Sequence, residues 1–260
     1  MRIDALLCNK GFFVSRNKAK ESIERGEIFF NGVKVDKPSL DVPEEFFSKI
    51  SVKRVATEFV SIGGFKLEKA LKDFDLSVKG LFAADVGAST GGFTDCLIKY
   101  GAKKVYSVDL NDGLLSDKLR ENPAVYPIIK NARYLTKNDF KEDLDLIVAD
   151  LSFISETLVL PVFADILGAN KKAVILIKPQ FESDVKVRRK NGIVNDKKEI
   201  LSAVEKVVLS AVSYGFTPEK LTTAPITSGK NIEFLLLLTR RKADNFYFDD
   251  FINKNFSVCK

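Results

Sequence analysis

The alternation of strands and helices in the second two-thirds of the chain constrains its fold more than any other feature. From about residue 81, short apolar runs alternate with helical stretches. The apolar runs, each of strand length, cover residues 81–86, 105–108, 125–129, 144–149 and 173–177. The helical stretches cover residues 94–100, 155–167 and 198–214. Buried strands that alternate with helices form a parallel sheet with helices on both faces, so the sequence predicts an α/β fold.

Both ends of the chain differ from this pattern. Towards the C-terminus, residues 218–223 and 232–238 are two close strand candidates that could pair as a hairpin at one edge of the sheet. The N-terminal segment predicts a small α+β unit instead. Ser15 can cap a helix that ends at Gly26, and Asn31-Gly32 is a preferred two-residue hairpin turn between residues 28–30 and 33–35.

The domain plan follows from these patterns. We expect a small head over residues 1–52 and a linker with the first helix of the large domain over residues 53–80. The large domain then covers residues 81–242, and the aromatic and polar tail over residues 243–260 has no assigned structure.

Composition narrows the chemistry that such a chain can perform. The chain has no histidine, so an imidazole base, a serine–histidine pair and a histidine metal ligand are all excluded. Cys8, Cys96 and Cys259 lie far apart and form neither a disulfide framework nor a zinc pattern, so we expect no metal. Lysine and carboxylate side chains must therefore carry any proton chemistry.

Charge and hydropathy indicate where the protein works. A formal net charge of +6 favours a polyanionic partner, although a lysine-rich composition explains it equally well. The longest apolar runs, such as residues 234–238, are far shorter than the roughly 20 residues of a membrane span. Because the N-terminus also lacks an apolar signal core, we expect a cytoplasmic protein without a membrane partner.

A glycine-rich turn follows the first strand of the large domain. Glycines at a strand-to-helix turn let a ligand approach the backbone, although this spacing is not the one found in dinucleotide-binding proteins. Asp109 ends the next strand, where an acidic residue can accept hydrogen bonds from ribose hydroxyls. The turn resembles the first motif of S-adenosylmethionine-dependent methyltransferases, which implies this cofactor. The turn residues that we expect to bind it are Asp85, Gly87, Ser89, Gly91, Gly92 and Phe93.

The head carries positive charge on its second helix. From charge alone, a solvated helix face is the favoured interpretation. The first 45 residues or so, however, closely resemble the S4 RNA-binding domain, with its helix bearing Arg16, Lys18 and Lys20 and its hairpin turn at Asn31-Gly32. That resemblance implies binding to structured RNA. The basic residues expected to contact RNA are Arg2, Arg16, Lys18, Lys20 and Arg25.

Four charged residues stand at positions where an α/β sheet binds ligands. Asp150 and Lys178 end adjacent strands, Lys66 follows a pair of glycines, and Glu233 opens the last strand. Any one of them could be an ordinary surface residue. Together they match the Lys–Asp–Lys–Glu tetrad of FtsJ-like ribose 2′-O-methyltransferases. With an S4 head, the chain resembles the TlyA (hemolysin A) family up to about residue 241.

The resemblance implies a Rossmann-like methyltransferase that modifies cytidine in ribosomal RNA of the large subunit, and possibly also of the small subunit. It also places Asn131 near the adenine of the cofactor. We interpret Lys178 as a base or proton-guiding group and Lys66 as the group that orients the hydroxyl or stabilises its developing negative charge. The chain departs from the family pattern at Ile62 and over residues 110–115.

Several alternatives remain at this point. Base-amino methyltransferases need prolines after the fourth strand, where this chain has Asp150-Leu151-Ser152-Phe153, and cytosine-C5 enzymes need a catalytic cysteine, whereas Cys96 lies within a predicted helix. A non-catalytic RNA-binding factor for ribosome assembly would not need the four charged residues. A membrane-lytic role finds no amphipathic or membrane-spanning segment.

Overall fold

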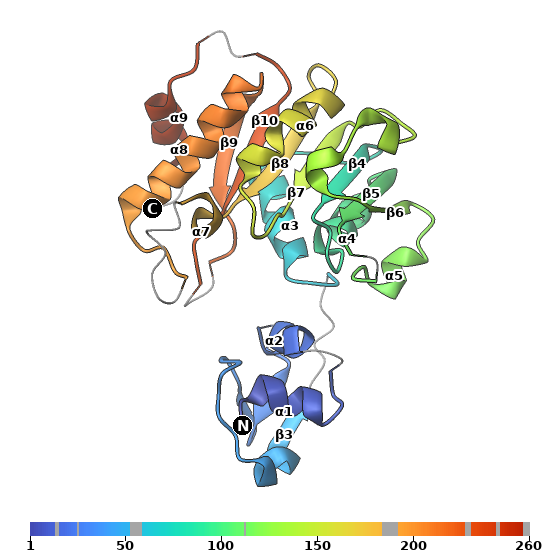
Figure 1. Cartoon of the computed structure of the whole chain (residues 1–260), viewed down its shortest axis with the longest axis vertical. Helices are drawn as coiled ribbons and strands as arrows, with labels where there is room; N and C mark the ends of the chain where they lie inside the picture. Colours follow the sequence, from blue (N-terminus) through green and yellow to red (C-terminus); the bar gives the residue numbers. More distant parts are fainter. Residues whose placement is uncertain are drawn as a thin grey trace. The chain divides into compact units, whose positions relative to one another are not determined.

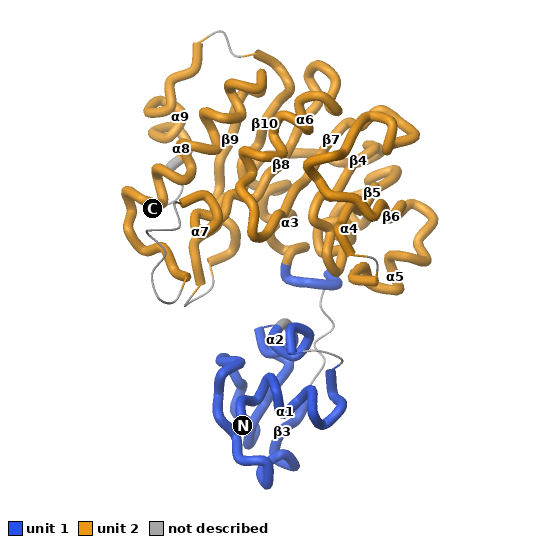
Figure 2. Tube along the Cα trace, viewed as in Figure 1, with its two compact units in different colours: residues 1–62 blue, residues 63–260 orange. Residues whose placement is uncertain are grey.

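The computed structural model describes residues 1–13, 16–24, 26–52, 59–111, 113–183, 192–226, 230–242 and 245–256. It divides into two compact units, Met1–Ile62 and Gly63–Lys260 (Figure 2). Among the described residues, no helix is both long enough and apolar enough to cross a membrane.

The N-terminal unit packs two helices and a three-stranded sheet around one small core. The core includes Ile3, Leu7, Ile23 and Ile28, all at most 1% exposed. In chain order, the elements are α1 (Ile3–Asn9), α2 (Arg16–Glu24), β1 (Ile28–Phe30), β2 (Val33–Lys34), the 3-10 helix η1 (Glu44–Lys49) and β3 (Ile50–Val52). The predicted hairpin is present as β1 and β2, and its two turn residues have φ of 51° and 77°. Ser15, the predicted helix cap, lies outside the described residues.

The C-terminal unit contains a seven-stranded sheet in the order β6-β5-β4-β7-β8-β10-β9 (Figure 1). Its strands are β4 (Phe82–Val86), β5 (Lys104–Asp109), β6 (Val125–Ile129), β7 (Leu146–Ala149), β8 (Lys172–Ile177), β9 (Thr217–Thr223) and β10 (Phe234–Thr239). Strands β4 to β8 pair in parallel, whereas β10 runs antiparallel to both β8 and β9. This arrangement confirms the predicted α/β fold and places the predicted C-terminal hairpin at one edge of the sheet.

Helices cover both faces of this sheet. They are α3 (Gly63–Phe74), α4 (Gly92–Lys99), α5 (Asp117–Arg120), α6 (Leu160–Ile166), α7 (Pro179–Glu182), α8 (Lys197–Ser213) and α9 (Phe248–Phe256), with 3-10 helices η2 (Ala132–Tyr134), η3 (Lys137–Asp139) and η4 (Glu156–Leu158). Val86 shares a core cluster with Phe163 of α6 and Val207 of α8. Asp85, its neighbour along β4, is bonded to Thr94 of α4. Because successive strand residues point to opposite faces, α4 lies on the face opposite to α6 and α8.

The helix expected over residues 155–167 is split. The chain forms η4 first, and α6 starts only at Leu160 with Pro161 in its first turn. Proline lacks the backbone N–H that an interior helical position must donate, so it is tolerated only at the start of a helix. The helix is therefore shorter than its apolar pattern suggests.

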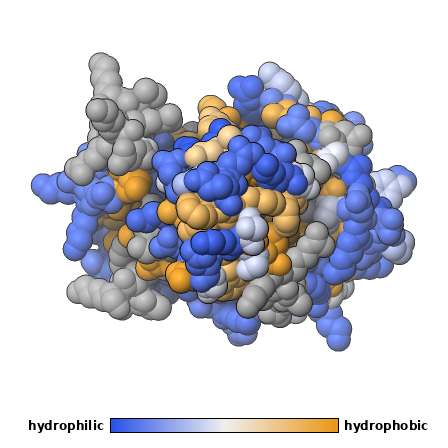
Figure 3. All heavy atoms as spheres, turned by 90° about the horizontal axis from the view of Figure 1, so that it is seen from below, coloured by the Kyte–Doolittle hydropathy of each residue, from blue (hydrophilic) through white to orange (hydrophobic). Residues whose placement is uncertain are grey.

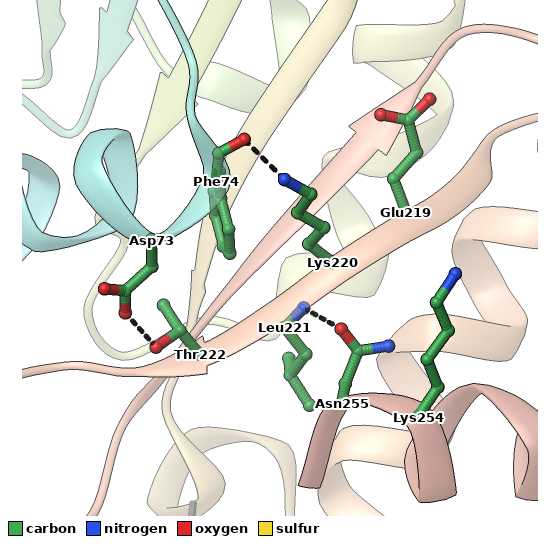
Figure 4. Close-up of a pocket in the computed structure, with 8 residues that line it drawn as sticks. All are labelled: Asp73, Phe74, Glu219, Lys220, Leu221, Thr222, Lys254 and Asn255. Carbon is green, nitrogen blue, oxygen red and sulfur yellow. Dashed lines mark hydrogen bonds between the residues drawn. The ribbon is translucent and has the colours of Figure 1, made fainter. Parts of the chain in front are cut away.

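The C-terminal tail, which the sequence left unassigned, contributes α9. This helix packs on the edge strand β9, where the Asn255 side-chain oxygen accepts the Leu221 backbone N–H at 3.0 Å (Figure 4). A cavity of about 230 Å³ lies beside this contact, and Lys220 crosses it to donate to the Phe74 carbonyl of α3 at 2.7 Å. An edge strand offers unpaired backbone groups, so α9 covers part of an edge that would otherwise be open to other chains.

Candidate active site

Lys66, Asp150, Lys178 and Glu233, called the tetrad below, meet at one edge of the sheet. Asp150 directly follows β7 and Lys178 directly follows β8, so both stand at the carboxyl ends of parallel strands. Strand β10 is antiparallel, with Phe234 opposite Ile177, so its beginning lies at the same edge and brings Glu233 there. Lys66 reaches the site from the first turn of α3.

The tetrad forms a chain of ion pairs with a lysine at one end and a carboxylate at the other. Lys178 Nζ lies 2.5 Å from Asp150 Oδ1, and Lys66 Nζ lies 3.7 Å from Asp150 Oδ2. Lys66 Nζ also lies 2.6 Å from Glu233 Oε2. Asp150 therefore contacts both lysines, so a change at this one carboxylate would disturb both amines.

The two lysines differ in their surroundings. Burial by itself lowers the pKa of Lys66, but the charges of Asp150 and Glu233 and their hydrogen bonds outweigh it and raise this pKa above its ordinary value. Lys66 is thus a persistent cation. The Lys178 side chain is only 8% exposed; its amine donates to Ser152 Oγ at 2.8 Å and lies 5.8 Å from the centre of the Phe181 ring.

The glycine-rich turn places a buried carboxyl group under the next helix. Asp85 is fully buried, and its Oδ2 accepts the backbone N–H and the hydroxyl of Thr94 at 2.8 and 2.6 Å. Its other oxygen, Oδ1, has no hydrogen-bond partner among the described residues. Burial raises the pKa of Asp85 to about 7, and the charges of Asp150 and Asp109 add to the effect of burial. A buried acceptor without a donor suits a ligand that brings a positive group.

Two glycines of the turn have positive φ and close neighbours. Gly87 has φ of +85°, and a Cβ there would lie 2.8 Å from the backbone oxygen of Asp150. Gly91 has φ of +93°, and a Cβ would lie 2.3 Å from Leu119 Cδ1. The turn is thus packed against the tetrad on one side and against α5 on the other, and the buried residues Gly92 and Phe93 begin α4.

The acid at the end of β5 closes the other side of the turn. Asp109 accepts the backbone N–H of Ser89 at 2.8 Å and that of Asn111 at 3.3 Å. The backbone N–H of Lys130 bonds to the Asp109 carbonyl at 2.9 Å, which brings the following Asn131 to the same edge of the sheet. The Asn131 side chain itself accepts the Arg133 N–H at 3.0 Å and starts η2.

In the N-terminal unit, two of the basic residues hold a buried acid. Asp4 is fully buried; Arg2 donates to it at 3.1 Å and Arg16 at 2.9 Å. Although burial opposes it, hydrogen bonding from Arg16 and Arg2 lowers the pKa of Asp4. Lys18 and Lys20 are half-buried on α2, and Arg25 lies outside the described residues.

Exposed aromatic side chains lie beside basic ones on the surface of the N-terminal unit. In the view of Figure 3, hydrophilic residues surround a smaller hydrophobic area. In the N-terminal unit, Phe12 and Phe46 are exposed, and Lys49 lies over the Phe46 ring at 4.7 Å. Basic and aromatic side chains are thus interleaved beyond α2, which the sequence did not indicate.

Sequence reasoning missed two residues beside the tetrad. Ser152 bonds to Lys178, and Phe153 is 87% exposed with φ of +70°, its ring 5.3 Å from that of Phe181. A large aromatic side chain that is exposed in the left-handed region is uncommon. The available signal was the aromatic residue that follows Asp150-Leu151-Ser152 at the carboxyl end of a strand.

Within the described part of the chain, no group of three or more histidine, cysteine, aspartate or glutamate residues could hold a metal ion. Cys8 and Cys96 are free thiols, and Cys259 lies outside the described residues. Burial raises the pKa of the Cys96 thiol, so this group is poorly suited to act as a nucleophile.

Comparisons with known proteins cover nearly the whole chain. A family model for FtsJ-like methyltransferases matches residues 59–241, and one for the S4 domain matches residues 1–45. Hemolysin A of Brachyspira hyodysenteriae is 40% identical over 90% of this chain and 98% of its own length. The 16S/23S rRNA (cytidine-2′-O)-methyltransferase TlyA of Mycobacterium tuberculosis is 35% identical over 91% of this chain and 89% of its own. A solved structure from Streptococcus thermophilus, provisionally titled a hemolysin, is 36% identical, covers 100% of this chain and 98% of its own, and superposes with a TM-score of 0.74.

Proposed function

This chain belongs to the TlyA (hemolysin A) family, in which an S4 domain precedes an FtsJ-like methyltransferase domain, and on that premise we propose that it methylates the ribose 2′-hydroxyl of cytidine in ribosomal RNA. The observation that supports this function best is the tetrad, because four residues far apart in the sequence meet at the carboxyl edge of the sheet. The methyl donor that we propose is S-adenosylmethionine, which supplies an electrophilic methyl group on a sulfonium.

The proposed chemistry assigns one task to each amine. The ribose oxygen must lose its proton as it gains the methyl group. Lys178 is the residue that we propose to take or guide this proton, held in place by Asp150 and Ser152. Lys66, kept charged by Asp150 and Glu233, would orient the hydroxyl and stabilise negative charge on its oxygen. Phe153, exposed beside the site, offers a ring on which a nucleobase could stack.

The residues at the turn fit the proposed cofactor. Asp85 Oδ1 is a buried acceptor with no partner among the described residues, and Asp109 offers a carboxylate at the strand end where ribose hydroxyls bind in related folds. We propose that Gly87, Ser89, Gly91, Gly92 and Phe93 shape this turn, with Asn131 near the adenine.

The pH dependence of cofactor binding tests the part played by Asp85. Because the pKa of Asp85 in the free protein is about 7, this carboxyl group is largely neutral below that pH. A cationic ligand favours the ionised form, so affinity should rise by up to about tenfold per pH unit up to pH 7 and then level off. Isothermal titration with S-adenosylmethionine measures this affinity as a function of pH. The range from about pH 5.5 to about pH 8.5 extends roughly one and a half units to either side of that pKa.

Asp85→Asn is the control for this titration, because an amide cannot ionise. The affinity of this variant should not change with pH. At about pH 8, roughly one unit above the pKa of the wild-type group, it should bind S-adenosylmethionine more weakly than the wild type does. A wild-type profile that is equally flat would contradict the proposed role.

The same carboxyl group also affects the stability of the free protein. Because burial favours its neutral form, its contribution to the free energy of unfolding is greatest below its ordinary pKa of 3.8 and is lost as pH rises through about 7.

The RNA substrate is proposed to bind through the N-terminal unit. The double variant Lys18→Glu/Lys20→Glu should weaken binding to ribosomal RNA by at least about tenfold and reduce the slope of affinity against salt by about two. Filter binding across a salt series measures both quantities. Arg16 is unsuitable for this test, because its loss would also leave the buried Asp4 with one cation fewer.

Lys197→Glu/Lys198→Glu is the matched control for RNA binding. It makes the same change in charge on exposed positions of α8, in the other unit. If both double variants lost affinity equally, binding would reflect overall charge, and the proposed role of α2 would be rejected.

Transfer of tritiated methyl groups to separated ribosomal subunits tests the whole proposal. Ribosomal RNA from cells that lack the gene should accept label at cytidine, and mapping the modified ribose would identify the nucleotide and the subunit. Binding to subunits without any transfer would instead support the alternative of a non-catalytic assembly factor. A ribosomal substrate would place the protein in the cytoplasm.

A further inference from the structure

Two further carboxyl groups are buried on the segments that follow the tetrad residues Asp150 and Lys178. Glu156, in η4, is 2% exposed, and Glu182, at the end of α7, is 4% exposed. Glu156 lies on the segment that follows Asp150, and Glu182 lies on the segment that follows Lys178. Acidic side chains are rarely buried together, because a buried charge is costly unless a partner of opposite charge or a hydrogen-bond donor stabilises it.

Glu182 ties the two catalytic segments together. Its carboxylate accepts the Glu156 backbone N–H at 2.7 Å and the Ser155 hydroxyl. Lys206 of α8 lies 3.8 Å from the same carboxylate and donates to the Glu182 carbonyl at 2.7 Å. Burial raises the pKa of Glu182, whereas the Ser155 hydroxyl, the Glu156 N–H and Lys206 lower it, so its surroundings favour the charged form more than those of Glu156 do.

Glu156 has the opposite surroundings. Neither of its side-chain oxygens makes a well-formed hydrogen bond to a described residue, although the Leu151 backbone lies close enough to lower its pKa. The groups that face it are the Leu151 backbone, two acids (Glu182 and Asp150) and one cation, Lys178. Burial, and then the charge of Glu182, raise the pKa of Glu156 well above its ordinary value.

We propose that Glu156 is a positioning residue, an un-ionised carboxylic acid that is buried beside Glu182 and supports the segment carrying Asp150 without placing a further negative charge near Lys178. The inference rests on the proposed function, in which Lys178 takes or guides a proton. An ionised Glu156 would hold that proton on the lysine and would repel both Asp150 and Glu182. Of the two acids, Glu156 is therefore the one whose surroundings favour the protonated form.

Glutamine substitutions at the two positions separate these states. Glutamine has the shape of an un-ionised glutamic acid, so Glu156→Gln should keep the rate of methyl transfer within about threefold of the wild type. Glu182→Gln should lower this rate by at least about tenfold, because its amide nitrogen would face hydrogen-bond donors. Glu156→Ala, which removes the support, should also lose at least about tenfold. Thermal unfolding and S-adenosylmethionine binding establish that each variant is folded.

Infrared difference spectra give a result that does not depend on activity. At neutral pH, the wild type minus Glu156→Gln should show the carbonyl stretch of a protonated, desolvated acid, and wild type minus Glu182→Gln should show a carboxylate. Absence of the protonated band would overturn the proposal. A loss of at least about tenfold in the activity of folded Glu156→Gln would also overturn it and would indicate that Glu156 relays a proton. An inactive wild type would reject the proposed function but leave the spectroscopic test intact.

Discussion

Replacing Lys178 by alanine should lower methyl transfer by about a thousandfold or more and leave cofactor binding largely unchanged. The amine is held by Asp150 at 2.5 Å and by Ser152 at 2.8 Å, so it has one defined position. Its removal takes away the group proposed to accept or guide the proton, and it leaves Asp150 with Lys66 alone at 3.7 Å. Single-turnover transfer of labelled methyl groups to ribosomal subunits, with cofactor affinity measured separately, gives both numbers.

Lys172→Ala is a matched control for Lys178→Ala. Lys172 begins the same strand, β8, at its other end, and its side chain is 38% exposed with Glu219 at 3.6 Å. Its loss should leave transfer unchanged. A fully active Lys178→Ala would reject the assignment of Lys178, whereas equal losses in the two variants would indicate damage to β8 rather than to the chemistry.

The parallel part of the fold could be predicted because its signals are local. Each strand from β4 to β8 is a short apolar run, and the carboxyl ends of parallel strands share one edge of the sheet. That rule alone brings Asp150 near Lys178. Glu233 does not follow from it, because its place depends on β10 being antiparallel, and only the family resemblance included it.

Other features had no readable signal. Strand β3 consists of Ile50–Val52, and it pairs with β1 across a long connection, so neither its length nor its neighbours in sequence reveal it. Glu156 and Glu182 look like surface acids in the sequence, since charged residues are almost never fully buried. Their burial becomes visible only once the segments that follow β7 and β8 lie together.

Charge patterning also has a limit in the N-terminal unit. Arg2 and Arg16 were expected to contact RNA because they are basic, yet the structure gives both of them a second task at the buried Asp4. Their guanidinium groups are still about half exposed, so the two tasks are compatible. A variant at either position would thus change stability and RNA binding together, so neither arginine is a clean probe of RNA binding.

Replacing Gly87 by alanine should destabilise the protein and also lower methyl transfer by about a hundredfold. With φ of +85°, an alanine costs roughly 1–2 kcal/mol in backbone strain. The new Cβ would in addition lie 2.8 Å from the backbone oxygen of Asp150, which cannot move away without moving the Asp150 carboxylate. The cofactor turn and the tetrad are therefore coupled through one glycine. Chemical denaturation and single-turnover transfer measure the two effects.

Gly80→Ala isolates the strain from the contact. Gly80 precedes β4 as Gly87 follows it, its φ of +77° is similar, and a Cβ there meets nothing within 4 Å. It should lose the same roughly 1–2 kcal/mol of stability and keep full activity. If Gly87→Ala proved no more harmful to methyl transfer than Gly80→Ala, the contact with Asp150 would not govern the tetrad. A selective loss in Gly87→Ala would instead show that the position of Asp150 is set from the cofactor side of the site.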